Sequence, residues 1–291
     1  MLLSAPEVQV TAPAIFRASK SSQPGEEVQL YNERTGGQFG ALTFAKVDDE
    51  FYGYFVANYL GKSQIKRIPL GAMTPSGQAD VLLDPAPSTI GLGDLVTDGS
   101  FLCWADGEGI WSMPIGGGTV PLQVAAGTEW ARLSVLGGTL YYTDGNAILS
   151  VPTGGGTPSN VLGTRFFPII ALYVLEEQLP VALAEPPGPP AVPDVALVWG
   201  RADGAVLGMV RGETTTYQEP TAGTTVSSVY STGGRILWIE QVSSGKKSSR
   251  VLMSFQGVTT TLSSDVGDWD LMADEVAAYW ASYSGVEKYT F

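Results

Sequence analysis

The sequence predicts an all-β fold, a single β-propeller domain that covers residues 1–291. Three observations predict it: a unit of about forty residues recurs along the chain, each unit contains short apolar strands joined by glycine-containing turns, and no helical pattern separates the strands. A lone four-stranded sheet cannot bury both of its faces, whereas sheets stacked around an axis cover one another. We therefore expect radially repeated four-stranded blades.

The two clearest repeats are neighbours in the chain. Residues 92–118 read LGDLVTDGSFLCWADGEGIWSMPIGGG, and residues 133–156 read LSVLGGTLYYTDGNAILSVPTGGG. Both contain an apolar strand, a glycine-containing turn, an aromatic strand, an Asp-Gly turn, a third apolar strand, and then proline and three glycines. Asp-Gly between apolar runs is a strong hairpin signal, because glycine supplies the positive φ that such turns require. The pattern predicts a repeated β-meander.

Weaker copies of the same meander extend in both directions. Three of them cover residues 47–71, 231–257 and 272–291, and the N-terminal segment 14–37 aligns with them loosely. A degenerate copy begins near Glu176 and contains the proline-rich insertion Glu185–Pro193, which is expected to be extended. All of these copies together account for most of the chain.

The blade count follows from the spacing of the copies. The second strands are expected to begin at Ile15, Phe51, Phe101, Leu140, Leu179, Ile236 and Val276, with spacings of 36, 50, 39, 39, 57 and 40 residues. This spacing favours seven four-stranded blades. The interval from Val276 through Phe291 to Ile15 holds only 30 residues, so six blades with an N-terminal appendage is the alternative. A strand within Leu2–Val10 is expected to complete the last blade and close the ring.

The second strands carry a recurring four-residue motif that resembles the YWTD and NHL-like propeller repeats. The copies are Tyr141-Tyr142-Thr143-Asp144, Cys103-Trp104-Ala105-Asp106, Tyr279-Trp280-Ala281-Ser282 and Leu237-Trp238-Ile239-Glu240. The resemblance implies a propeller fold and does not imply an activity. YWTD propellers usually have six blades, so seven would be a departure. Small propellers of this kind also occur as accessory proteins in bacterial peptide natural-product clusters, which suggests a bacterial source.

Charge and apolar run length limit the classes of partner. The net charge is −13, from 29 acidic and 16 basic residues. Such a field repels phosphate backbones and anionic lipid surfaces, so neither a nucleic-acid nor a membrane partner is expected. The apolar runs are too short to cross a bilayer. The N-terminus MLLSAPEVQV lacks the basic region of a signal peptide. We therefore expect a cytoplasmic protein, or alternatively an exported protein whose signal has been removed. We also expect a monomer.

The residue types present also limit the chemistry. The chain has no histidine and one cysteine, which excludes the usual zinc, copper and iron sites and histidine-dependent triads. Cys103 lies in the strand FLCWAD and is expected to be a buried, inert thiol. No cofactor is expected apart from calcium, for which carboxylates at Asp265, Asp268 and Asp270 are candidates. The spacing of an EF-hand loop is missing there, so a turn-forming role is the favoured interpretation.

Paired acids occur at three places: Asp48-Asp49-Glu50, Glu176-Glu177 and Asp274-Glu275. Of two neighbouring carboxyl groups, one can act as a general acid and the other as a general base when their environments give them different pKa values. All three groups fall at equivalent turns between a first and a second strand, away from the usual ligand face. Their repeated position favours a role in the turns.

The expected ligand face is built by loops that join second to third strands and by connections from one blade to the next. On this assignment it includes the insertion Glu185–Pro193. The candidate binding residues are Trp130, Arg132, Arg165, Phe166, Phe167 and Trp269. Aromatic side chains there could stack on a peptide or a flat small molecule, and arginine could pair with a carboxylate. The alternative is that they pack between neighbouring blades as core.

These observations lead to two functional hypotheses. The first is a non-catalytic binding or accessory module that presents a peptide or small-ligand site at the mouth of the propeller channel. The alternative is a metal- or carboxylate-dependent hydrolase, or a tailoring enzyme in a bacterial biosynthetic pathway. A third, an adaptor between proteins, would require a large exposed apolar patch. The sequence does not decide whether the protein is an enzyme.

Overall fold

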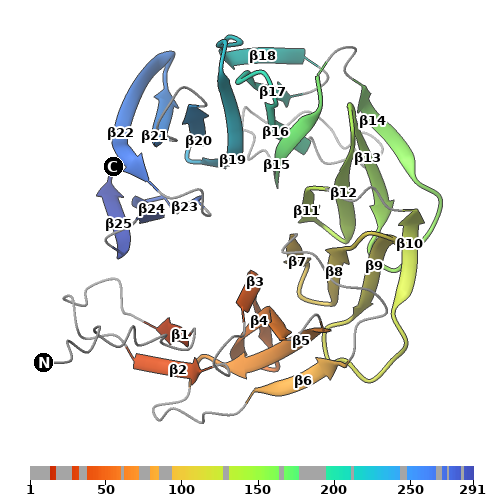
Figure 1. The fold of residues 1–291 in the computed structure, drawn as a ribbon. Coiled ribbons are helices and arrows are strands. Elements are labelled where there is room, and N and C mark those ends of the chain that lie inside the picture. Colours follow the sequence, from red (N-terminus) through yellow and green to blue (C-terminus); the bar gives the residue numbers. More distant parts are fainter. Residues whose placement is uncertain are drawn as a thin grey trace, which may run out of the picture. The chain divides into compact units, whose positions relative to one another are not determined.

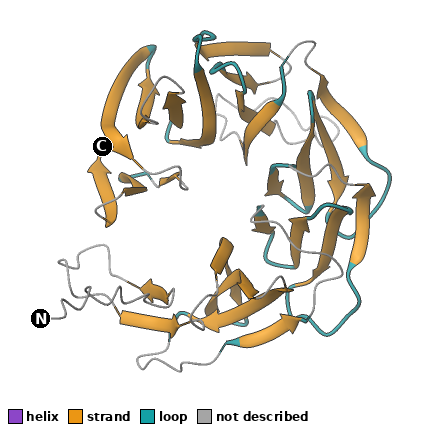
Figure 2. Ribbon diagram, viewed as in Figure 1, coloured by secondary structure: helices purple, strands orange, loops and turns teal. Residues whose placement is uncertain are grey.

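The computed structural model describes most of the chain. The described residues are 14–17, 28–32, 38–59, 62–71, 79–84, 94–126, 131–163, 167–176, 195–210, 213–242, 248–266, 271–273, 275–282 and 285–291. All regular structure in them is β-strand, as Figure 2 shows. None of them forms a helix of the length and hydropathy that a membrane span requires. The chain divides into two compact units, residues 1–129 and 130–291.

Unit 1 contains two four-stranded antiparallel meanders and one hairpin (Figure 1). The hairpin pairs β1 (Ala14–Arg17) with β2 (Val28–Asn32). The first meander comprises β3 (Gln38–Val47), β4 (Glu50–Tyr59), β5 (Lys62–Pro69) and β6 (Asp80–Leu83). The second comprises β7 (Leu95–Thr97), β8 (Phe101–Ala105), β9 (Gly109–Pro114) and β10 (Leu122–Ala126).

Unit 2 contains three four-stranded meanders followed by a three-stranded sheet. The first meander comprises β11 (Leu133–Leu136), β12 (Thr139–Asp144), β13 (Ala147–Pro152) and β14 (Ser159–Gly163). The second comprises β15 (Ile169–Glu176), β16 (Val195–Arg201), β17 (Val206–Val210) and β18 (Glu213–Gln218). The third comprises β19 (Thr224–Thr232), β20 (Arg235–Val242), β21 (Ser248–Phe255) and β22 (Val258–Val266). The last sheet comprises β23 (Leu271–Ala273), β24 (Ala277–Ser282) and β25 (Gly285–Thr290).

The described residues therefore form six blade-type sheets, and the favoured count of seven is wrong. In the described part of the segment expected to be a seventh blade, residues 14–17 and 28–32, the strands β1 and β2 pair as a hairpin. The physical reason is length, since the segment of residues 14–37 is short for four strands and their three turns. The expected closing strand at Leu2–Val10 lies outside the described residues. The single-domain assignment for residues 1–291 stays a prediction.

The clearest repeats fold as the sequence predicts. Between β12 and β13, Asp144 pairs with Ala147, and the two-residue turn is Gly145-Asn146 with Gly145 at a φ of 55°. The Gly116–Gly118 and Gly154–Gly156 runs each begin with a turn closed on the preceding proline. Gly117 N–H donates to the Pro114 carbonyl at 2.9 Å, and Gly155 N–H donates to the Pro152 carbonyl at 2.9 Å. These glycines are turn residues that end the third strand.

The insertion lies at a different place in its meander from the one predicted. Strands β15 and β16 pair with each other, and residues 177–194 connect them. The insertion therefore lies between the first strand, β15, and the strand that pairs with it, β16, and does not join a second strand to a third. Leu179, where the second strand was expected to begin, lies outside the described residues. The second strand of this sheet is β16, which contains Val198-Trp199-Gly200-Arg201, a further copy of the repeated motif. The insertion itself lies outside the described residues.

Apolar side chains from adjacent sheets form the cores of both units. In unit 1, Tyr54 and Ile65 of the first meander pack with Leu102 and Trp104 of the second. In unit 2, three such clusters join the four sheets in chain order. The motif tryptophans are central to these cores: Trp104, Trp199, Trp238 and Trp280 are all 3% exposed or less. Each blade buries the aromatic residue of its second strand, which explains why the motif repeats.

Candidate functional site

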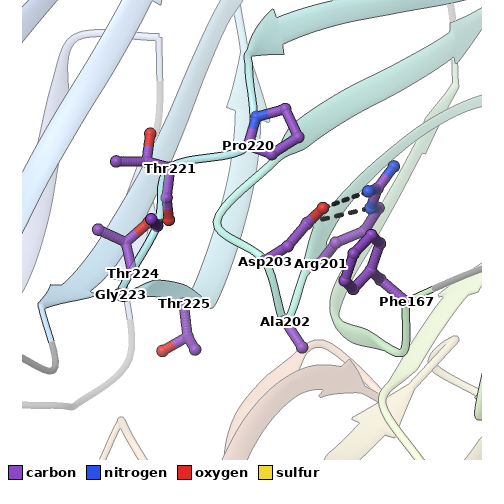
Figure 3. Close-up of a pocket in the computed structure, with 10 residues that line it drawn as sticks. Phe167, Arg201, Ala202, Asp203, Pro220, Thr221, Gly223, Thr224 and Thr225 are labelled. Atoms are coloured by element: carbon purple, nitrogen blue, oxygen red, sulfur yellow. Dashed lines mark hydrogen bonds and ion pairs between the residues drawn. The ribbon is translucent and has the colours of Figure 1, made fainter.

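The candidate site lies where the turns between second and third strands gather with the connections between sheets. In a four-stranded meander the second and fourth strands end on the same side, so these two kinds of loop share one face. In unit 2 this face holds a cavity of about 510 Å³. It is drawn in Figure 3 and lined by Phe167, Arg201, Ala202, Asp203, Pro220, Thr221, Ala222, Gly223, Thr224 and Thr225.

An arginine and an aspartate in one turn form the charged wall of the cavity. Arg201 ends β16, and its N–H donates to the Ala205 carbonyl at 2.9 Å, which closes the turn. The Arg201 Nε–H donates to Asp203 Oδ1 at 3.1 Å, and its Nη2 pairs with Oδ2 of the same carboxylate (Figure 3). The two side chains are 19% and 11% exposed. A bidentate pair held within one short turn is rigid, and both groups still reach the cavity.

Phe167 forms the aromatic wall beside this ion pair. The Arg201 Cζ atom lies 4.9 Å from the centroid of the Phe167 ring, so the guanidinium stacks on the ring face. The Phe167 side chain is 41% exposed. The Ala202 N–H donates to the Pro168 carbonyl at 3.0 Å, which ties the segment of Phe167 to the turn of Arg201. An exposed ring fixed on a cation is a surface on which a flat ligand group can pack.

The third wall is the connection from β18 to β19. The Thr221 N–H donates to the Asp203 carbonyl at 3.0 Å, and the Thr224 Oγ1 donates to the Thr221 carbonyl at 2.8 Å. Gly204 is required here, because a Cβ on it would lie 2.1 Å from Thr224 Oγ1, and its φ is 84°. This connection and the Arg201 turn are therefore packed against each other without space for a larger residue.

A buried carboxylate below the cavity links two sheets. Glu240 in β20 is fully buried. Its Oε1 accepts a hydrogen bond from Gln218 Nε2 at 2.8 Å, and its Oε2 pairs with Arg250. Gln218 Nε2 also donates to the Gly204 carbonyl at 3.0 Å. The network holds the Arg201 turn on the β19–β22 sheet.

Two of the six predicted binding residues are described, and only one of them lines the cavity. Phe167 does so. Arg132 is half-buried, and its Nε–H donates to the Ile170 carbonyl at 2.9 Å, so it braces the start of β15. The other four, Trp130, Arg165, Phe166 and Trp269, lie outside the described residues. The same holds for Asp268 and Asp270 and for the side chain of Asp265, so calcium binding there stays a prediction.

The candidate binding residues named from the sequence do not include Arg201, Asp203, Thr221, Thr224 or Thr225. The three threonines do belong to a connection from one blade to the next, a kind of loop that the sequence assigned to the ligand face. One signal could have found Arg201. It stands at the last position of the motif, where the other copies have Asp106, Asp144, Glu240 and Ser282. A basic residue at a position that is acidic in three of the other four copies marks one blade as different.

The described residues give little support to the catalytic alternatives, as the paired acids, the cysteine and the candidate metal ligands show in turn. Asp48 and Asp49 occupy the turn between β3 and β4 as predicted, with φ of 50° and 67°. Cys103 is fully buried in β8, and burial raises the pKa of its thiol to about 12, so it is not a thiolate at neutral pH. Among the described residues, no group of three or more acidic or cysteine side chains is placed to hold a metal ion.

The comparisons with known proteins identify the fold. The sequence matches no protein-family model, and no curated protein is significantly similar to it. Many solved structures do match, among them a chain of a nidogen/laminin complex, with a TM-score of 0.57, 13% identity, and coverage of 88% of this chain and 90% of that chain. The fold is a six-bladed β-propeller. The YWTD-type resemblance is thus supported as architecture, and no sequence family is identified.

Two further neighbours are larger proteins. PorZ, a surface component of the type-IX secretion system of Porphyromonas gingivalis, matches with a TM-score of 0.57 at 13% identity. The match covers 87% of this chain and 31% of PorZ. A puromycin-hydrolysing peptidase of Mycobacterium tuberculosis has a TM-score of 0.57 at 14% identity, with 92% and 48% covered. The chain thus spans less than half of either neighbour, and identities this low show the fold alone.

Proposed function

We propose that this propeller is a non-catalytic binding module whose ligand is a short peptide held in the cavity of Phe167, Arg201 and Asp203. Propellers typically serve as binding or scaffold modules, and the nidogen/laminin neighbour is itself part of a protein complex. The observation that carries the proposal is the exposed Phe167 ring stacked on the Arg201–Asp203 pair at the edge of a cavity of about 510 Å³. Cavities of this size are typical of ligand sites.

The lining chemistry suits a peptide. The ring of Phe167 offers a face for an apolar or aromatic side chain of the ligand. The Thr225 hydroxyl and the exposed backbone of residues 221–223 can bond peptide amides, and the Thr221 hydroxyl, which donates to the Glu219 carbonyl at 3.3 Å, can accept a further hydrogen bond. The loops stand on packed sheets, so ligand binding requires little ordering of the site.

The same lining does not favour carboxylate catalysis. Of the described residues that line the cavity, Asp203 alone carries a carboxylate, and Arg201 already neutralises it. General acid–base hydrolysis by carboxylates needs two such groups with separated pKa values. The sequence also supplies no histidine to serve as a base. Binding is therefore the function that these residues support best.

The proposal is tested by selecting peptides from a random heptapeptide library displayed on phage. Enriched peptides are synthesised, and their dissociation constants are measured by isothermal titration calorimetry. We expect Phe167→Ala to weaken the best peptide at least about fivefold, since removing an aromatic contact at a binding site commonly costs 1 kcal/mol or more. Because Phe167 is exposed, the substitution should leave the fold intact.

The matched control is Phe51→Ala. Phe51 lies in unit 1 and is 57% exposed, so the same side chain is removed from a surface without the cavity. We expect its affinity for the peptide to equal that of the unchanged protein. Equal affinity of Phe167→Ala and the unchanged protein, or no enrichment of any peptide, would overturn the proposal.

A further inference from the structure

A second cavity in unit 2 lies on the other side of the blades. It has a volume of about 520 Å³ and sits between the β15–β18 and β19–β22 sheets. Its lining includes the turn Gly233-Gly234 between β19 and β20, and Glu275 in the turn between β23 and β24. Turns between first and second strands emerge opposite to the loops of the first cavity. The two cavities therefore share no lining residue.

The floor of this second cavity is apolar and closely built. Leu197, Val198 and Ile236 line it and are 1%, 3% and 6% exposed. The ring of Tyr217 lies across Gly208, where a Cβ would approach the Tyr217 Cε2 atom to 2.7 Å. A glycine is thus needed for the aromatic ring to form this wall. A cavity with an apolar floor and an aromatic wall fits the apolar part of a small ligand.

The charge of the lining has one sign. Glu275 is the charged residue among the described residues of this lining, and it is exposed. Arg235 contacts the rim through a 3.4 Å hydrogen bond from Nη1 to the Gly233 carbonyl. Arg235 does not line the cavity, and its guanidinium, which keeps its positive charge, is held between two rings, with Cζ 4.6 Å from the Phe255 centroid and 4.4 Å from the Phe291 centroid. Glu275 and the net charge of −13 both favour a cationic ligand.

We propose that this second cavity binds a small organic cation: an ammonium group joined to an apolar body. The apolar body would occupy the floor of Leu197, Val198 and Ile236. The ammonium group would be attracted by the Glu275 carboxylate, and the face of the Tyr217 ring would favour the same charge. This site is independent of the peptide site, so either can exist without the other.

The test compares two probes of matched shape, 4-phenylbutylamine and the neutral 4-phenylbutanol. Isothermal titration calorimetry at low salt should show tighter binding of the amine. Glu275→Gln should weaken the amine about fivefold, which corresponds to about 1 kcal/mol for a solvent-accessible ion pair, and should leave the alcohol unchanged. Val210→Trp, which fills the cavity, should remove the binding of both probes, and circular dichroism checks that this variant is folded.

The control for charge is Glu213→Gln, which removes one exposed carboxylate from β18 outside this lining. It should bind the amine as the unchanged protein does. Equal affinity for amine and alcohol, no detectable amine binding, or an equal loss in Glu213→Gln and Glu275→Gln would overturn the proposal. None of these results would bear on the peptide site.

Discussion

At the scale of single residues, the Glu240 network makes an asymmetric prediction about stability. Glu240 is fully buried, whereas its partner Arg250 is 41% exposed. Arg250→Met would leave a buried carboxylate without its cation, at a cost of about 3 kcal/mol in the free energy of unfolding. Glu240→Gln should cost less, because the Arg250 guanidinium can then turn to water. Urea unfolding of both variants measures the difference.

The control for this prediction is a surface ion pair. Lys46 pairs with Asp49 at 2.7 Å, and the two side chains are 51% and 95% exposed, so both stay hydrated when the pair is lost. Lys46→Met should therefore cost at most about 1 kcal/mol. If Arg250→Met were no more destabilising than Glu240→Gln, Glu240 would not depend on its cation.

Single residues of the site were predicted only in part, and the reason is physical. Phe167 could be named from the sequence because large aromatic residues between blades are visible without coordinates. Arg201 and Asp203 form a wall because residues two positions apart close into a turn, and because Phe167 is brought beside that turn from the segment that precedes β15. No pattern in one sequence encodes that convergence. The threonines of the β18–β19 connection cannot be told from ordinary turn residues without the cavity.

At the scale of strands and sheets, the meanders of residues 92–156 were predictable because their turns carry strong local signals. The sheet β15–β18 was not, since a long insertion separates its first two strands and shifts the apparent repeat. The motif copy Val198-Trp199-Gly200-Arg201 then seemed to belong to a later strand. The count of blades failed at the chain ends, where a two-stranded hairpin has the composition of a repeat without its length.

Packing between strands of neighbouring sheets predicts a strict requirement for glycine in β16. A Cβ on Gly200 would lie 2.4 Å from Cγ1 of Val226, a fully buried residue of β19. Gly200→Ala should destabilise the protein by about 1–3 kcal/mol through overpacking, measured by urea unfolding. The double variant with Val226→Gly, which also removes the Val226 Cβ that would lie at 2.6 Å, should lose less stability than the sum of its single variants.

Gly163→Ala is the matched control for this prediction. Gly163 ends a strand of the same unit, and nothing lies within 4 Å of a Cβ built on it. Its substitution should change stability by only a few tenths of a kcal/mol. A double variant less stable than the sum of its single variants would show that Val226 is not the residue in conflict.

At the scale of the whole molecule, the apolar repeat and the acidic net charge bear on different properties: the repeat on the fold, and the charge on the expected partners. The fold follows from the apolar repeat, and each unit is held by cores between adjacent sheets. The net charge of −13 instead predicts which partners are disfavoured, because such a field is expected to repel polyanions and attract cations. Our two binding proposals are consistent with this field, since neither ligand is a polyanion.

The buried thiol of Cys103 and two buried tyrosine hydroxyl groups predict that the protein loses stability at alkaline pH. Burial raises the pKa of the Cys103 thiol to about 12 and also raises the pKa of Tyr141 and Tyr142. A raised pKa means that the folded state keeps a proton which the unfolded chain releases. The stabilisation is complete below the pKa of the unfolded group and is lost as the pH rises toward the folded value. Stability should therefore fall above about pH 9, where an unfolded thiol ionises.

Cys103→Ala isolates the thiol from the growing charge repulsion that affects every variant equally. The thiol alone should account for a slope of at most about 1.4 kcal/mol per pH unit above pH 9. In urea unfolding measured from pH 7 to pH 10.5, the variant should show a constant offset below pH 8 and a shallower decline above pH 9. Parallel curves over the whole range would mean that the folded and unfolded thiols titrate alike, against the burial of Cys103 in the core of β8.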